Sequence, residues 1–449
     1  MTFKRARRLA PALAAAAFAA ALAGGSAASA SAATQCSGSG ITGQGASVEK
    51  LAISTVWGPD FNKSTNSFAC SGSQGSGGLP VVTYNSTSSG TGLDSWGVSK
   101  GAASFGPLNA FIGTEEAPNP TAISEIEANE TTIVPTTVQT IPVAQEAIIP
   151  IIHLPAGCTA TSTAAPGRLV LNNITLEGIF RGSITNWSQI TEDGDSVSGS
   201  GCVNTTPITK VVRLDSGGTT DVLKKYLDLV NTASFEDEAG ATVTWNEIAE
   251  GTTNTEWPKV DAVVRPTKTG DSAEVSLVAS TASSIGYASL ADTRANTAFG
   301  SAGGANTATF WPEVQNSGTT TKNPKYADPS TNGESGTVAN ANCASTKYTN
   351  GKGTKFPPAS TADSWSQVTT ATKEKNFPIC AIVYDLGLSS YSAYPGTTEG
   401  EAITAENFLQ FVLATKAEGG QPLIVGHDYE PLPKSLVKEA VKGAALLAF

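Results

Sequence analysis

The segment Val211–Tyr226 most constrains the fold, because it combines a strand pattern, a glycine-rich turn and a helix pattern in one short stretch. Its sequence, VVRLDSGGTTDVLKKY, begins with an apolar pair and ends in an alternation of apolar and charged residues that is typical of a helix. The first N–H groups of a helix lack backbone partners and the helix dipole favours negative charge there, so such a turn can bind an anion. Arg213 adds a planar cationic fork, and Thr219 and Thr220 add hydroxyl donors. The same residues also allow a simple junction in which Asp215 or a threonine caps the helix.

Two further turns of this kind occur earlier in the chain. The first is ITGQGAS over Ile41–Ser47, which precedes a helical pattern starting at Val48. The second is NSTSSGTG over 85–92, which follows the strand pattern Leu79–Tyr84 and contains Ser89. A serine N-cap explains the first turn as well as a binding role does, and a flexible low-complexity loop explains the second.

Strand and helix patterns alternate along most of the chain. Buried strands are expected within Val138–Leu154 and over Ile379–Tyr384, and the clearest amphipathic helix over Thr404–Thr415. This alternation predicts an α/β protein, in which turns at strand ends gather at the carboxyl edge of a sheet. The segment Thr293–Lys375 is rich in Asn, Thr, Ser, Gly and Lys, and we expect a long insertion with little core of its own.

The N-terminus has the pattern of a secretory signal. A basic stretch precedes the apolar run Leu9–Gly24, which is too short and too rich in alanine for a comfortable membrane span. The basic residues are Lys4, Arg5, Arg7 and Arg8. Ala-Ser-Ala triplets over 28–30 and 30–32 predict cleavage near residues 30–32, so that 1–32 is a signal peptide. We therefore expect a secreted or cell-envelope protein.

The acidic composition limits the possible partners. Removing the signal takes away four of the 28 basic and none of the 39 acidic residues, which leaves a net charge near −15. This charge argues against nucleic acid and anionic lipid as partners. An anionic ligand would have to be captured by local donors against the field of the whole protein.

Six cysteines follow the signal, and an even number in an exported chain predicts disulfides. We favour sequential pairing, because each pair then brackets one compact segment. The predicted disulfides are Cys36–Cys70, Cys158–Cys202 and Cys343–Cys380. A lipid-modified Cys36 is the alternative, but the preceding Ala33-Thr34-Gln35 lacks the residues of a lipoprotein signal.

Metal and histidine chemistry have little support in the sequence. The chain has two histidines, His153 and His427, which are far apart in sequence. His153 follows an apolar run and is expected to be a hydrogen-bonded residue near a strand end. The sequence contains no H-E-x-x-H motif and no Cys/His cluster with metal-ligand spacing, so no metal site and no cofactor are expected.

Together with their surroundings, these motifs resemble the substrate-binding proteins of bacterial phosphate ABC transporters. The resemblance covers most of the mature chain and rests on segments that occur in the order of that family. They are ITGQGAS, VTYNSTSSGTG, FIGTEEAP, LVLNNITLEGIFRGSITNW, VVRLDSGGTT, ASSIGYASLAD and DYEPLPKSL. VVRLDSGGTT and LEGIFRGSITNW are the specific ones, since turns rich in glycine and serine are weak signals alone.

The resemblance implies an α/β, two-lobed periplasmic-binding-protein (Venus-flytrap) fold, in which each lobe is a helix-flanked mixed sheet. Residues 33–140 and 385–449 would form lobe 1, and residues 141–384 would form lobe 2 with a polar insertion around 293–375. The implied function is that of an exported, monomeric, non-enzymatic protein. It would capture inorganic phosphate in the cleft between the lobes and deliver it to a membrane ABC permease.

The resemblance also assigns phosphate-binding positions, residue by residue, to these turns. They are Ser47 and the N–H of Val48, then Ser89, Glu116, Arg213, the N–H groups of Gly217 and Gly218, Thr219 and Thr220. Asp215 would orient Arg213 through a salt link. Glu116 stands where the family has an aspartate, an acceptor-only group that takes the proton of hydrogen phosphate and repels fully ionised sulfate. Its neighbour Glu115 is the alternative for this role.

The chain departs from the family pattern at two further places. Gly217 stands where the family usually has a serine, and a serine falls one position earlier at Ser216. Val48 replaces a large aromatic residue. Both changes leave phosphate favoured while allowing lower affinity or a related oxyanion.

Two other functions compete with phosphate transport. A secreted hydrolase such as a phosphatase would use Ser89 or Thr219 as nucleophile, but neither histidine lies near these motifs in the sequence. A surface protein of the same fold with weak or different oxyanion binding is the third reading. The replacement at Gly217 and the long insertion Thr293–Lys375 keep this third hypothesis open.

Overall fold

The computed structural model describes residues 38–449 with several internal gaps. The gaps are 64–66, 71–78, 100–108, 129–134, 193–196, 204–205, 237–241, 247–254, 258–262, 301–307, 317–324, 333–338, 351–364, 367, 372–375 and 395. The predicted signal peptide and Cys36 therefore lie outside the described residues, as does the side chain of Cys70. In the described part of the chain, no helix is both long enough and apolar enough to cross a membrane.

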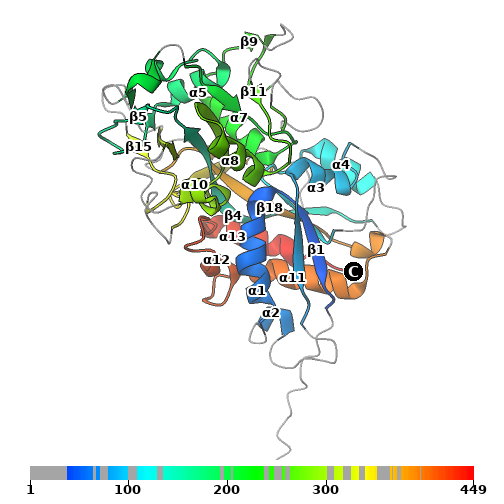
Figure 1. Ribbon diagram of the computed structural model, residues 1–449. Helices are drawn as coiled ribbons and strands as arrows, with labels where there is room; N and C mark the ends of the chain where they lie inside the picture. Colours follow the sequence, from blue (N-terminus) through cyan, green and yellow to red (C-terminus); the bar gives the residue numbers. More distant parts are fainter. Residues whose placement is uncertain are drawn as a thin grey trace, which may run out of the picture.

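A mixed sheet forms the centre of the molecule (Figure 1). Its strands, in spatial order, are β11 (Val263–Val264), β8 (Thr209–Val211), β12 (Ser284–Ser289), β4 (Val138–His153), β18 (Cys380–Leu388), β3 (Phe111–Thr114), β1 (Ile41–Gly45) and β2 (Val82–Ser86), with β13 (Thr309–Phe310) also paired to β4. Strands β1, β2 and β3 are parallel, as are β8, β11 and β12, whereas β4 and β18 pair antiparallel with their neighbours.

The long strands β4 and β18 belong to two hydrophobic cores. On β4, Val138–Ala144 contributes to one core, and Ala147–Ile152 contributes to the other. On β18 the change falls between Ala381 and Ile382. The molecule is therefore two-lobed, with β4 and β18 passing from one lobe to the other. The predicted α/β, two-lobed fold is confirmed.

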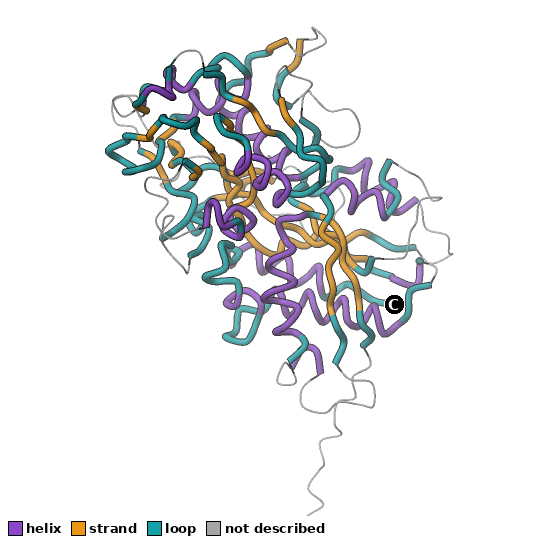
Figure 2. The backbone as a smooth tube through the Cα atoms, viewed as in Figure 1, coloured by secondary structure: helices purple, strands orange, loops and turns teal. Residues whose placement is uncertain are grey.

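Helices surround the central strands in both lobes (Figure 2). On the side of the first core these are α1 (Gly58–Phe61), α2 (Ser67–Cys70), α3 (Ser89–Ser95), α4 (Pro120–Ala128), α11 (Glu399–Leu413), α12 (Gly420–Leu423) and α13 (Lys434–Ala444), together with the 3-10 turn Ser47–Glu49 and the π-helix Ala52–Trp57. On the other side they are α5 (Asn173–Arg181), α7 (Gly218–Val230), α8 (Asp271–Ser280), α9 (Leu290–Ala295) and α10 (Thr297–Gly300).

Local sequence explains where several of these helices begin and end. The side chain of Thr398 accepts from the N–H of Glu401, and the Glu401 carboxylate accepts from the N–H of Thr398 at 2.7 Å, so a capping box starts α11. Asn172 caps α5, which ends at Gly182 in the left-handed conformation with φ of 94°.

The apolar run Val138–Leu154 forms the single strand β4, although it contains two prolines. Opposite Pro142 the pairing with β18 shifts register between Val383 and Tyr384. Proline has no N–H for the ladder, and a bulge accommodates that loss within a sheet. All residues of β4 except His153 are buried, which explains why the run is apolar on both faces.

The segment 293–375 has more core than its composition predicts. Besides β13, its described parts form β14 (Glu313–Gln315), β15 (Tyr326–Ala327), β16 (Lys347–Asn350) and β17 (Val368–Ala371). Phe310, Trp311 and Val314 are fully buried in the second core. The remaining strands are β5 (Thr159–Ala160), paired with β7 (Val197–Ser198), β6 (Val170–Leu171), paired with β14, and β9 (Phe235–Glu236), paired with β10 (Thr242–Val243).

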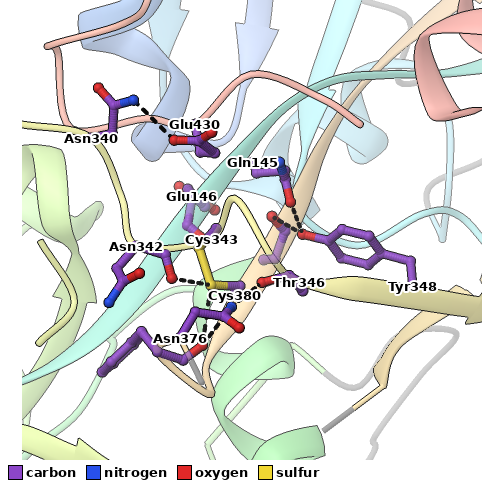
Figure 3. Close-up of a disulfide and its surroundings, with 12 residues drawn as sticks. Gln145, Glu146, Asn340, Asn342, Cys343, Thr346, Tyr348, Asn376, Cys380 and Glu430 are labelled. Atoms are coloured by element: carbon purple, nitrogen blue, oxygen red, sulfur yellow. Dashed lines mark hydrogen bonds between the residues drawn. A yellow bond between two sulfur atoms is a disulfide. The ribbon is translucent and has the colours of Figure 1, made fainter. Parts of the chain in front are cut away.

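Two of the three predicted disulfides are present, Cys158–Cys202 and Cys343–Cys380. The third predicted pair lies outside the described residues. Figure 3 shows the Cys343–Cys380 bond beside Glu146 of β4. Hydrogen bonds tie the same region to its surroundings: Asn376 donates to Thr346 at 2.6 Å, and Tyr348 donates to Gln145 at 2.9 Å. The bond thus attaches the polar segment, at Cys343, to β18, one of the two strands that join the lobes.

Loss of the Cys343–Cys380 disulfide is expected to lower the free energy of unfolding by about 3 kcal/mol, because the bond restricts the unfolded chain. Urea denaturation of a Cys343→Ala, Cys380→Ala double variant measures this loss. The Cys158→Ala, Cys202→Ala double variant is the matched control and should lose a similar amount, since the sequence separations are 37 and 44 residues. A wild-type unfolding free energy in the first variant would contradict a stabilising role for the bond.

Candidate functional site

The predicted turns meet where the two lobes face each other. Strands β1, β2 and β3 are parallel, so their carboxyl ends bring Ser47, Ser89 and Glu115 to one edge of the first lobe. From the second lobe, the turn after β8 presents Arg213, and the N-terminus of α8 presents Asp271. Figure 1 shows α3 and α8 on opposite sides of this junction.

Within the described part of the chain, three backbone N–H groups connect the lobes at this edge. Gly90 donates to the carbonyl oxygen of Ser216 at 3.0 Å, and Gly218 donates to the hydroxyl oxygen of Ser89 at 3.3 Å. Asp271 donates from its N–H to the hydroxyl oxygen of Ser47 at 3.1 Å. The contacts leave no room for a side chain at Gly218, because a Cβ there would lie 2.7 Å from the Ser89 hydroxyl. The turns are therefore closely packed.

Arg213 is the cation at the centre of this junction, and only 2% of the residue is exposed. Its Nε and Nη2 donate to the carboxylate of Asp215 at 2.8 and 2.6 Å, so the salt link expected between these residues is present. Nη1 donates to the hydroxyl oxygen of Thr219 at 3.2 Å and to Oδ1 of Asp271. The guanidinium is thus held between two buried carboxylates.

Glu115 faces hydroxyl groups from both lobes. Its Oε2 accepts from Ser89 at 2.7 Å, and its Oε1 accepts from Thr219 at 2.5 Å. Burial, followed by repulsion from Asp271, raises the pKa of Glu115 to about 7, although both hydroxyl bonds oppose the change. Glu115 can therefore either accept or donate a proton near neutral pH.

Glu116, the residue first assigned as the proton acceptor, lies in a different environment. Its N–H donates to the hydroxyl oxygen of Thr114 at 3.0 Å, which fixes the turn. Its negative charge acts on two lysines of α7. Burial lowers the pKa of Lys224 to about 8, although Asp221 and Glu116 oppose the change, and the same two carboxylates raise the pKa of Lys225 against the effect of burial. The structure brings Glu115, the alternative, together with Ser89 and Thr219.

The other predicted positions divide between the junction and its surroundings. Gly217 is the N-cap residue of α7, with no side-chain cap, and its N–H donates to the carbonyl of Thr255 at 3.1 Å. The hydroxyl of Thr220 bonds to that of Tyr287 at 2.7 Å, within the second lobe. Ser216 bonds to the side chain of Thr255, so its hydroxyl does not replace the one absent at position 217. Val48 is fully buried.

Asp271 was not anticipated from the sequence. It is the first residue of α8, its side chain is fully buried, and it accepts from Arg213, from Thr219 at 3.1 Å and from the N–H of Ser289 at 3.2 Å. The preceding Gly270 has φ of 90°, a conformation that favours glycine. The stretch TKTGDSAEV is one more glycine turn leading into a helix, so the criterion used for the other turns could have found it.

The fold and the junction can be compared with known proteins. A family model described as a PBP superfamily domain matches residues 25–416. The chain belongs to the PBP superfamily. No curated protein sequence matches it.

Solved structures with this PBP fold include phosphate-binding proteins. A phosphate-binding protein from Stenotrophomonas maltophilia has 17% identity and a TM-score of 0.57, over 90% of this chain and 93% of that chain. An ancestral soluble variant of the human phosphate-binding protein has 19% identity and a TM-score of 0.56, over 89% and 92%. A DING protein has 17% identity and a TM-score of 0.54, over 89% and 92%. These likenesses establish a shared fold over nearly the whole length of each chain.

The Glu115→Gln variant is expected to lose part of the pH dependence of stability. The pKa of Glu115 is raised from 4.5 to about 7 on folding. Its contribution to the free energy of unfolding is therefore fully present below pH 4.5 and is lost as the pH rises through about 7. A change of this size corresponds to roughly 3 kcal/mol. Urea denaturation between about pH 4.5 and about pH 8 measures the slope for wild type and variant.

Glu116→Gln is the matched control for this experiment, because it removes the neighbouring carboxylate from the same turn. Its stability should keep the wild-type slope over the interval in which Glu115 titrates. Equal flattening of the slope in both variants would contradict the assignment of this titration to Glu115.

Proposed function

We propose that this protein is an extracytoplasmic solute-binding protein that captures inorganic phosphate between its lobes and delivers it to a membrane ABC permease. The observation that carries this proposal is the convergence of Arg213, Ser89, Thr219 and Glu115 from the two lobes. The guanidinium provides donors for phosphate oxygens, and Glu115 provides an acceptor for a phosphate proton. A phosphate proton on Glu115 would free the Ser89 and Thr219 hydroxyls to turn towards the ligand. Closure of the lobes would enclose the anion.

Phosphate fits this set of groups better than sulfate. Hydrogen phosphate carries a proton that it can donate to the Glu115 carboxylate, whereas sulfate presents lone pairs to it. Two acceptors that face each other in a buried site, such as a sulfate oxygen and the Glu115 carboxylate, make the binding free energy less favourable by an amount on the order of 1–3 kcal/mol. A difference of this size is enough for marked selectivity. The α7 N-terminus, with Gly218 at its first turn, adds a favourable dipole for either anion.

Hydrolysis is less well supported by the same geometry. Ser89 and Thr219 donate to Glu115, but neither is hydrogen-bonded to a histidine that could act as a general base. His153 lies at the end of β4, where its Nδ1 is 3.1 Å from the carbonyl of Val278. A reversible one-to-one complex without turnover is therefore the expected behaviour. The similar phosphate-binding structures and the predicted signal peptide support the transport role.

Titration calorimetry with phosphate, sulfate and arsenate on desalted protein tests this function. We expect reversible binding of one phosphate per chain, weaker or no binding of sulfate, and no release of phosphate from a phosphate ester. Absence of phosphate binding at every pH would overturn the proposal. Steady turnover of the ester would favour a hydrolase instead.

Glu115→Gln is expected to improve sulfate binding by about tenfold or more, because the amide offers a donor where the carboxylate offers lone pairs. Phosphate affinity should fall in the same variant. Glu116→Gln serves as the control and should keep the wild-type preference for phosphate. If Glu116→Gln admits sulfate and Glu115→Gln does not, the first assignment of the proton acceptor was correct and the present one is wrong.

Arg213→Ala is expected to weaken phosphate binding by about 100-fold or more, since it removes charge-assisted bonds from a buried site. The substitution also leaves Asp215 and Asp271 without their cation, so circular dichroism must show that the variant is folded. Near wild-type affinity in a folded variant would exclude Arg213 from the binding site.

A further inference from the structure

Asp271 occupies a position at the junction that a phosphate oxygen would also favour. Its carboxylate takes one corner of the Arg213 guanidinium and accepts from the Thr219 hydroxyl at 3.1 and 3.3 Å. Its N–H donates to Ser47 in the other lobe. The side chain is fully buried, so these contacts are made without water competing strongly for them.

The hydroxyl groups at the junction have too few hydrogens for two carboxylates and a ligand. Ser89 has one hydroxyl hydrogen, which it donates to Glu115. Thr219 also has one, and both Glu115 and Asp271 lie within hydrogen-bond distance of it. One hydrogen cannot satisfy both acceptors well. An incoming ligand therefore meets acceptors that need protons, and few hydroxyl donors are left for it.

The charges around Asp271 add to this effect. Arg213 is the positive group that contacts it, and the Asp215 carboxylate already binds two nitrogens of that guanidinium. The other titratable groups that interact with Asp271 come from β3, α8, α9 and β4. They are Glu115 after β3, Glu274 on α8, Asp292 on α9 and Glu146 on β4. A dianion placed here would be repelled more strongly than a monoanion.

We propose that Asp271, acting together with Glu115, makes the site selective for a singly charged, doubly protonated tetrahedral oxyanion such as dihydrogen phosphate. This inference rests on the proposed function and names the form of the ligand. Dihydrogen phosphate brings two hydroxyl groups, one for each carboxylate, whereas monohydrogen phosphate brings one and sulfate brings none. It also carries one negative charge instead of two. Arg213 and the α7 N-terminus bind its remaining oxygens.

The Asp271→Asn variant separates this role from a merely structural one. The amide keeps the shape of the side chain but removes one negative charge and supplies a donor. The variant loses the charged acceptor for one ligand hydroxyl, so it should bind phosphate a few-fold more weakly than wild type near pH 5.5. Near pH 8.5, where the dianion predominates, it should bind about tenfold more tightly than wild type. A structural role would instead lower the affinity at every pH.

Asp292→Asn is the matched control. Asp292 is also buried, but it accepts from Ser272 and Ser289 and makes no contact with Arg213 or Thr219 among its hydrogen bonds. Calorimetric titration with inorganic phosphate at the two pH values should show Asp292→Asn losing nearly as much affinity as wild type when the pH rises, since this variant removes a nearby charge but no carboxylate that contacts Arg213 or Thr219. Asp271→Asn should lose much less.

The outcomes distinguish this inference from the proposed function. If wild type binds phosphate but Asp271→Asn shows the wild-type pH dependence, or binds more weakly at both pH values, the role of Asp271 is overturned and phosphate binding stands. If wild-type affinity is constant or increases with pH, the selectivity for the doubly protonated form is likewise overturned. If none of the variants binds phosphate at either pH, the proposed function fails, and this inference fails with it.

Discussion

The buried guanidinium of Arg213 is the group on which the junction between the lobes depends. Placing a charge in a protein interior is costly unless it is paired and hydrogen-bonded, and here Asp215 and Asp271 together engage all three guanidinium nitrogens. Asp215 belongs to the same turn as Arg213, whereas Asp271 comes from α8, so the pairing also fixes one segment against the other. Through Thr219 the network continues to Glu115 and Ser89 in the first lobe. The ion pairs that allow Arg213 to be buried thus determine which side chains face each other at the junction between the lobes.

The sheet explains how this network can form between two separate cores. Each lobe has its own hydrophobic core, and both cores include parts of β4 and β18. Contacts at the carboxyl edges of the strands consist mainly of hydrogen bonds between polar groups, which can exchange with a ligand more readily than packed apolar side chains can. The disulfide Cys343–Cys380 holds the polar segment against β18. Two separate cores, two shared strands and a polar junction are the features that the proposed closure on a small anion requires.

The sequence predicted the fold and the meeting of the turns because both follow from local patterns. Strands that end in glycine and hydroxyl residues bring those residues to one edge, as Ser47 and Ser89 show. The choice between Glu115 and Glu116 could not be made in this way, since adjacent residues at a turn point in different directions and only packing against α7 decides between them. The buried parts of the segment 293–375 were missed because short strands paired at long range leave little periodic signal. The turn before Asp271 has the same pattern as the other turns, but its contact with Arg213 joins residues far apart in the sequence, which no local pattern predicts.

The excess of carboxylates at the junction fits the proposed selectivity better than it fits a site that relies on electrostatic attraction. A protein with a net charge of −11 does not attract anions from a distance, and a further positive residue in the cleft would have been the simplest route to higher affinity. Instead, Glu115 and Asp271 offset the charge of Arg213 and compete for the same hydroxyl hydrogen. Such an arrangement lowers the affinity for anions that carry no proton. The affinity is lowered least for an anion that carries enough protons to satisfy both carboxylates. In the proposed site, discrimination would arise from hydrogen-bond matching, which salt screens less than it screens an attraction between exposed charges.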